Sequence, residues 1–177
     1  MLKKAVIVVG PAVEDTEFSY PYYRLQEDGF SVDVASNGGV DIIAKHGLPI
    51  KANMDIKKLK ESDYDMLIVP GGLESPDRLR QIPELLDFIK EMNSENKLIT
   101  SVCHGPWVLI SAGIVRGKNM TTYVGCKDDL INAGAIYHDV SVIADGNIVT
   151  SPHFRDNALW MKETLETYYK LNKQNDL

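Results

Sequence analysis

The sequence predicts an α/β protein with a mostly parallel β-sheet and helices on both of its faces. Three mostly apolar runs, at residues 4–9, 65–69 and 98–102, are too short to form helices of their own. Continuous apolar runs of this length are typical of strands buried on both faces, as the strands of a parallel sheet are. A turn and then a segment with helical spacing follow each run, which is the order of a strand–helix–strand unit.

The first half of the chain contains one complete unit of this kind. After the strand at residues 4–9, a helix is expected to begin at Asp15 or Thr16, because its apolar residues recur at spacings of four and three. Residues 30–35 form the next strand. Residues 36–53 are richer in glycine and carry two short strand-like pieces, so we expect a small antiparallel excursion at the edge of the sheet.

The second half continues the alternation of strands and helices. Pro83 opens a helix with its apolar residues on one face, and this helix leads to the strand at residues 98–102. A hairpin is expected between strand-like segments at residues 140–144 and 148–150, because an Asp-Gly pair lies between them. A last helix has its buried stripe on residues 158–168.

Length and composition limit the classes of function. The 177 residues are expected to form a single domain over residues 1–177, and the chain can bury a core without disulfides. The net charge of −6 and the absence of a basic stripe exclude nucleic acid as a partner. No apolar stretch reaches membrane-spanning length, and the run at residues 5–9 is too short for a signal peptide. We therefore expect no membrane partner, a cytoplasmic location, and free thiols at Cys103 and Cys126.

Cys103 lies where a strand is expected to end and a helix to begin. The pair His104-Gly105 follows it, and Pro106 then suits the first turn of a helix. The N–H groups of a helix N-terminus lower the pKa of a nearby thiol, and the thiolate is its reactive form. The turn is similar in geometry to the nucleophile elbow of serine hydrolases. A buried structural cysteine is the alternative interpretation.

Loops after the three strands carry groups that suit thiol chemistry. Parallel strands end at one edge of a sheet, so acidic residues 14–17, Gly71-Gly72 and Cys103-His104 are expected to converge there. His104, or a histidine from elsewhere, would act as general base or acid, and N–H groups of the Gly-Gly loop and of the residue after Cys103 would hold an oxyanion. A carboxyl beside a thiolate must be protonated or lie farther away. These groups also have an interpretation without catalysis. The glutamate would be an ordinary residue of a first helical turn, and the Gly-Gly pair would be a tight turn that binds no ligand.

The chain resembles the ThiJ/PfpI superfamily, and specifically the PfpI-type intracellular cysteine hydrolases. The resemblance extends over most of the chain and implies a flavodoxin-like three-layer sandwich with a nucleophile-elbow cysteine. It is carried by Glu14-Asp15-Thr16-Glu17, Tyr20-Pro21-Tyr22-Tyr23-Arg24-Leu25, Val32-Asp33-Val34-Ala35-Ser36, Lys45-His46-Gly47, Pro70-Gly71-Gly72, Cys103-His104-Gly105-Pro106, Lys127-Asp128-Asp129 and Asn132-Ala133-Gly134-Ala135.

The same resemblance implies roles for individual residues. Cys103 would be the nucleophile, and Glu17 the carboxyl that contacts it. His104 would be oriented by an acidic residue of a neighbouring subunit, best matched by Asp77. The loop before Asp77 is one residue longer than in the PfpI-type pattern, so Glu74 competes for this role. A homo-oligomer, a dimer or larger, is implied, and no cofactor or metal is expected.

The substrate pocket is expected to be lined by Gly71, Gly72, Glu14 and Tyr123, of which Tyr123 matches a pocket tyrosine of the family. The stretch Ser151-Pro152-His153 departs from the family pattern, because it places a histidine where none is expected. His153 is either a second imidazole near the pocket or only a loop residue, and we favour the loop residue.

The sequence is compatible with three functions. The first is a stress-related enzyme that acts on reactive carbonyls through a Cys103 thiolate, of the glyoxalase III or protein deglycase type. The alternatives are a PfpI-type intracellular cysteine peptidase and a non-catalytic redox-sensing stress protein or chaperone. A small-molecule carbonyl or a peptide is the expected substrate. An amidotransferase glutaminase is excluded because no histidine has a glutamate two residues later, and the first strand lacks the G-x-G-x-x-G of dinucleotide-binding proteins.

Overall fold

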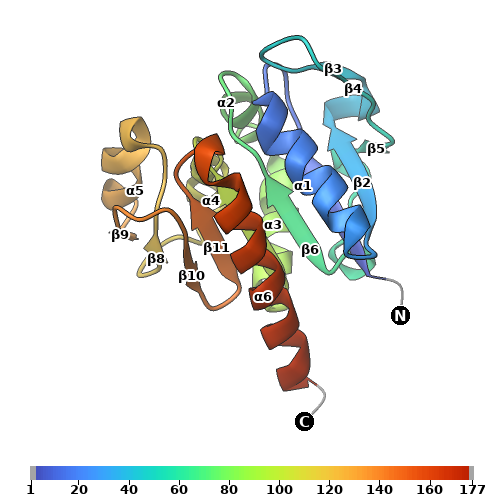
Figure 1. Cartoon of the computed structure of the whole chain (residues 1–177). Coiled ribbons are helices and arrows are strands. Elements are labelled where there is room, and N and C mark those ends of the chain that lie inside the picture. The colour runs from blue at the N-terminus through green and yellow to red at the C-terminus, as the bar shows by residue number, and fades with distance from the viewer. Residues whose placement is uncertain (1–2, 176–177) are drawn as a thin grey trace.

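A computed structural model describes residues 3–175 of the chain, and within them the centre is a seven-stranded sheet (Figure 1). The strand order is β10-β11-β7-β6-β1-β2-β5, and every neighbouring pair is parallel except β10 and β11. The strands are β1 (Lys4–Val8), β2 (Ser31–Ser36), β5 (Met54–Asp55), β6 (Met66–Val69), β7 (Leu98–Val102), β10 (Ile143–Asp145) and β11 (Ile148–Ser151).

Helices cover both faces of this sheet. Figure 1 shows α1 (Asp15–Glu27) and α6 (Asn157–Asn175) side by side on the near face, with α3 (Pro83–Ser94) and α4 (Pro106–Ser111) behind it. The short helices α2 (Ser75–Leu79) and α5 (Lys127–Asn132) complete the set. The predicted flavodoxin-like three-layer α/β fold is therefore confirmed. None of these helices within residues 3–175 has the length and hydrophobicity needed to cross a bilayer.

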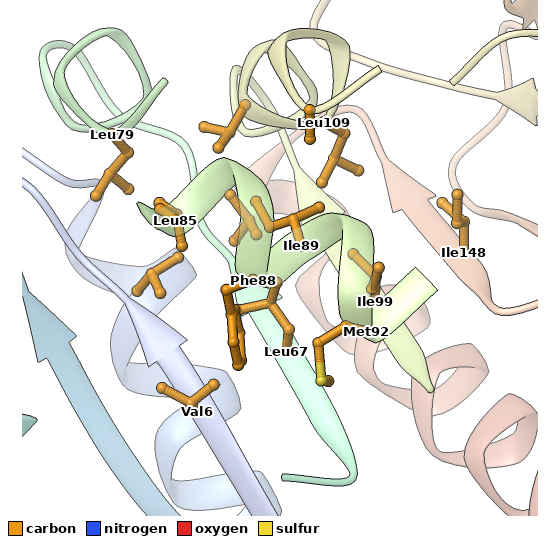
Figure 2. Packing of buried hydrophobic residues seen from close by; sticks show 14 of the residues in the cluster. Val6, Leu67, Leu79, Leu85, Phe88, Ile89, Met92, Ile99, Leu109 and Ile148 are labelled. Carbon is orange, nitrogen blue, oxygen red and sulfur yellow. The ribbon is translucent and has the colours of Figure 1, made fainter. Parts of the chain in front are cut away.

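Two hydrophobic cores lie on opposite faces of the sheet, because side chains alternate along each strand. Leu67 and Ile99 pack with α3 and α4 in one core, whereas Ile68 packs with α1 and α6 in the other. Figure 2 shows Leu85, Ile89 and other residues of α3 over the first of these faces. Burial on both faces is the physical reason for the continuous apolar runs in the sequence.

The shortest elements differ from the sequence-based expectations. The antiparallel pair β3 (Ile42–Ile43) and β4 (Pro49–Ile50) forms within the predicted excursion, but β5, which pairs in parallel with β2 at the sheet edge, was not expected. The strand predicted at residues 140–144 is shorter and begins later, as β10. A separate two-stranded parallel sheet is formed by β8 (Asn119–Met120) and β9 (Ile136–Tyr137). Two-residue strands carry too few side chains to show a period.

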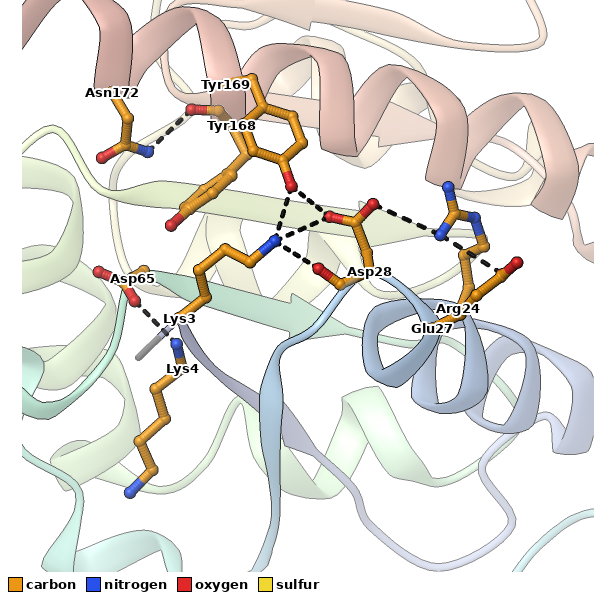
Figure 3. A network of polar contacts seen from close by, with 9 residues as sticks. All are labelled: Lys3, Lys4, Arg24, Glu27, Asp28, Asp65, Tyr168, Tyr169 and Asn172. Atoms are coloured by element: carbon orange, nitrogen blue, oxygen red, sulfur yellow. Dashed lines mark hydrogen bonds and ion pairs between the residues drawn. The ribbon is translucent and has the colours of Figure 1, made fainter. Parts of the chain in front are cut away.

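A polar network joins three elements at the amino end of β1 (Figure 3). The ammonium of Lys3 donates to Asp28, at the end of α1, and to the Tyr169 hydroxyl of α6, which also donates to Asp28. Arg24 adds an ion pair with Asp28 at 3.7 Å. Exposed ion pairs stabilise little individually. The network links the carboxyl end of α1 to α6, and the opposite end of α1 carries Glu17.

Candidate active site

Cys103 lies at a sharp turn between β7 and α4. Its φ of 59° is in the left-handed region, which non-glycine residues seldom adopt, so the turn is strained. Gly105 is required two residues later, because a Cβ there would lie 2.3 Å from both the Ser101 Oγ and the Val69 carbonyl oxygen. The sulfur is therefore held at the carboxyl edge of the sheet by backbone geometry.

His104 lies directly against the sulfur. Its Nδ1 lies 3.2 Å from the Cys103 Sγ. The imidazole stacks on Tyr123, with ring centroids 4.8 Å apart, and meets the Trp107 ring edge-on at 5.2 Å. Burial, assisted by the charge of Lys45, lowers the pKa of His104 below its usual value of 6.5. The ring is therefore neutral near pH 7 and can accept a proton from the thiol.

Glu17 reaches the site from the first turn of α1 and is fully buried. Its Oε2 accepts a hydrogen bond from the Gly71 N–H at 2.8 Å. Gly71 permits this approach, because a Cβ on it would lie 2.8 Å from both that oxygen and the Cys103 Cβ. Burial raises the pKa of Glu17 to about 7. A large fraction of the carboxyl therefore carries its proton at neutral pH.

Two expectations about this site need correction. Burial, together with the charge that Glu17 carries when ionised, raises the pKa of the Cys103 thiol, so the predicted lowering is wrong. The N–H groups of His104 and Gly72 do favour the thiolate, but desolvation outweighs them. The Gly71 N–H is engaged by Glu17 and is not free to hold an oxyanion, so only Gly72 of the two glycines keeps that role as a prediction.

The raised pKa of Glu17 makes a prediction about stability. A group whose folded pKa lies above its unfolded value of 4.5 stabilises the fold fully below that value, and the contribution is lost as the pH rises through about 7. The loss amounts to roughly 3 kcal/mol. Glu17→Gln, which is neutral at every pH, is expected to remove this dependence and to be more stable than the wild type above pH 8. Urea unfolding between pH 4 and 9 measures it.

A matched control is Glu27→Gln, on the same helix with a side chain that is 75% exposed. This variant should keep the wild-type dependence on pH. Parallel stability curves for Glu17→Gln and the wild type would show that folding does not raise the pKa of Glu17.

Around the sulfur is a pocket of about 190 Å³. Six residues of its lining were predicted, and four were not. The predicted ones are Glu14, Glu17, Gly72, Cys103, His104 and Tyr123, and the others are Lys45, Leu73, His153 and Phe154. The prediction that Gly71 lines the pocket is wrong, because its N–H is turned to the Glu17 carboxyl and only Gly72 of the pair is in the lining. Asp77 and Glu74 are exposed and do not line the pocket. Their orienting role from a neighbouring subunit stays a prediction.

Lys45 was not among the site residues expected from the sequence, and His153 was expected in the pocket only as the less favoured alternative. Lys45 lies in the turn of the antiparallel excursion, which folds back so that its Nζ is 3.2 Å from Glu14. The preferred interpretation of His153 as a loop residue alone is wrong, because its imidazole lines the pocket. The signal that could have identified His153 was its departure from the family pattern.

One cluster of the described residues has the composition of a metal site, namely Glu14, Asp15 and His46, whose ligand atoms lie within 4.8 Å of one another. Both oxygens of Asp15 already accept backbone N–H groups, those of His46 and Leu48. Glu14 is paired with Lys45. The cluster is thus satisfied by protein donors.

The fold and this turn define a class: flavodoxin-like α/β proteins with a cysteine at the strand–helix elbow beside a histidine and a buried glutamate. The sequence profile of the DJ-1/PfpI family matches residues 3–167. The chain belongs to the DJ-1/PfpI family, and the predicted resemblance is confirmed.

Several relatives with assigned names are similar over most of their length. Deglycase PH1704 from Pyrococcus horikoshii is 41% identical over 160 residues, which cover 90% of this chain and 96% of that protein. Deglycase PfpI from Pyrococcus furiosus is 40% identical over 150 residues, 85% and 90% of the two chains. YraA from Bacillus subtilis, whose name suggests a cysteine protease, is 37% identical over 166 residues, 93% and 98% of the two chains.

Solved structures show the same fold. A two-domain protein from Anabaena variabilis, with DJ-1/ThiJ/PfpI-like and ferritin-like domains, superposes with a TM-score of 0.90 at 36% identity, covering 93% of this chain and 49% of that one. DJ-1beta from Drosophila melanogaster superposes with a TM-score of 0.86 at 26% identity, covering 100% and 99%.

Proposed function

We propose that this chain is a cysteine-dependent enzyme that acts on reactive carbonyls, of the glyoxalase III or protein deglycase type. One observation carries the proposal: the Cys103 Sγ lies 3.2 Å from a neutral imidazole, beside a buried carboxyl that can carry a proton, in a pocket of about 190 Å³. A pocket of this size suits a carbonyl compound of a few carbons. Relatives named deglycase support the same class of reaction.

The groups present are sufficient for conversion of methylglyoxal and water into lactate. His104 takes the thiol proton, the sulfur forms a bond to the aldehyde carbon, and the carbonyl electron pair moves to oxygen, which takes the proton of Glu17. The Glu17 carboxylate then removes the hydrogen on that carbon as a proton, and the hydroxyl proton of that carbon moves to the oxygen of the adjacent carbon. Glu17 returns its proton to the adjacent carbon, which leaves the thioester of lactate. Water breaks the S–C bond, and lactate and the thiol are released. No external oxidant or reductant is needed.

Peptide hydrolysis is the second candidate, and the name of YraA favours it. It needs a carboxylate to orient His104, which Asp77 of the partner subunit would supply in a homo-oligomer. The small pocket favours the carbonyl reaction instead, because a peptide needs contacts on both sides of the scissile bond. We place the enzyme in the cytoplasm, in line with its two free thiols.

A substrate panel tests the proposal. The purified protein is incubated with methylglyoxal, with a methylglyoxal adduct of a thiol or an amine, and with fluorogenic peptides. We expect lactate from methylglyoxal or from its adducts and no cleavage of peptides. Release of lactate from the adducts alone would assign the deglycase type. Peptide cleavage without lactate would overturn the carbonyl assignment in favour of the peptidase.

A further inference from the structure

His153 lines the same pocket as His104. It follows β11, in the loop that leads into α6. Its ring centroid lies 6.2 Å from that of Tyr123 and 4.1 Å from that of Phe154, and Tyr123 in turn stacks on His104. The pocket therefore contains two imidazoles, and the reaction described above uses only the one beside the sulfur.

The hydrogen bonding of His153 determines which of its two ring nitrogens can donate to a ligand. Its Nδ1 accepts the backbone N–H of Arg155 at 3.3 Å. Burial, with the charge of Arg155, lowers the pKa of His153, so the ring is neutral near pH 7. In the neutral ring the proton is then on Nε2. Within residues 3–175 no group accepts a hydrogen bond from this nitrogen.

Three other donors of the pocket, namely Lys45, Glu17 and the Gly72 N–H, are engaged or lie at the sulfur. The ammonium of Lys45 is paired with Glu14 at 3.2 Å. Glu17 and the Gly72 N–H lie at the sulfur, where the aldehyde oxygen would be. An oxygen on the adjacent carbon of a substrate would extend away from the sulfur along the pocket, and a neutral N–H donor on the wall suits it.

We propose that His153 is a specificity-determining residue that donates a hydrogen bond from Nε2 to the second oxygen of a 1,2-dicarbonyl substrate. The inference rests on the proposed carbonyl chemistry and says which carbonyl compounds the pocket selects. His153 makes the pocket prefer compounds with oxygens on adjacent carbons over simple aldehydes of the same length. One hydrogen bond of this kind accounts for a preference of about tenfold for the dicarbonyl compound over the simple aldehyde.

Protection of Cys103 from alkylation by iodoacetamide tests this with a readout other than turnover. Methylglyoxal and propanal have three carbons each and differ in the second oxygen. Both form a reversible hemithioacetal, in which the S–C bond forms and the carbonyl oxygen takes the thiol proton, and this adduct blocks alkylation. The concentration that halves alkylation is measured for each compound from the mass of the Cys103 peptide, in the wild type, His153→Phe and His153→Gln.

We expect His153→Phe to reduce the preference for methylglyoxal over propanal about tenfold, with the propanal value unchanged. His153→Gln keeps an N–H donor and should remain within about threefold of the wild type. An unchanged preference in His153→Phe, or an equal shift for both compounds, would overturn the inference. Absence of lactate in the substrate panel would overturn the proposed function alone, because protection is measured separately from turnover.

Discussion

Cys103→Ala is expected to abolish formation of lactate from methylglyoxal, with a loss of about a thousandfold or more. Removal of a nucleophile that forms a covalent intermediate removes the whole reaction path, and the remaining groups of the site cannot replace it. Alanine keeps the Cβ at a φ of 59°, so the turn keeps its backbone strain and the fold is expected to persist. Lactate is measured over time at equal protein concentration, and circular dichroism checks the fold.

Cys126→Ala is the matched control, because it removes the second thiol, which lies outside the pocket. Cys126 is buried and is not among the residues that line the pocket, so its thiol does not meet a substrate bound there. This variant should keep the wild-type rate. Equal rates for the wild type and Cys103→Ala would refute the role of Cys103. Loss of activity in both variants would point to a shared structural defect, which the circular dichroism spectra would reveal.

Gly72→Ala is expected to destabilise the protein by about 3 to 5 kcal/mol. Gly72 has a φ of +107°, which costs any other residue about 1 to 3 kcal/mol. A Cβ there would also lie 2.4 Å from the Ala12 carbonyl oxygen and 2.6 Å from the Glu14 nitrogen, and overpacking adds about 1 to 3 kcal/mol. Both are backbone atoms, so no flexible side chain can move away. Urea unfolding measures the loss.

Gly47→Ala separates the two causes. Gly47 has a similar φ of +97°, but nothing lies within 4 Å of its added Cβ. This variant should carry only the conformational cost, so Gly72→Ala should be less stable by about 2 kcal/mol. Gly72→Ala should also lose activity, because Gly72 forms a β-bridge with Val13, just before α1 and Glu17. Equal losses of stability would show that the loop relaxes around the new methyl group.

The sequence by itself determined the sheet and the position of the cysteine. Apolar runs and turn residues are local signals, so the strands β1, β6 and β7 were predicted to within a residue or two. Since parallel strands end at one edge, the convergence of Glu17, the Gly-Gly loop and Cys103 followed from their order in the chain. The two-residue strand β5 was not predictable, because its pairing depends on β2, which lies about twenty residues earlier in the chain.

Only the tertiary structure decided the protonation of the site and which loops complete the lining of its pocket. A helix N-terminus lowers a thiol pKa, and this is visible in sequence, but the opposing desolvation depends on how deeply α1 and the loops bury the sulfur. Lys45 and His153 likewise reach the pocket through loops separated by more than a hundred residues. Their placement is set by the packing of whole elements, and no local pattern encodes it.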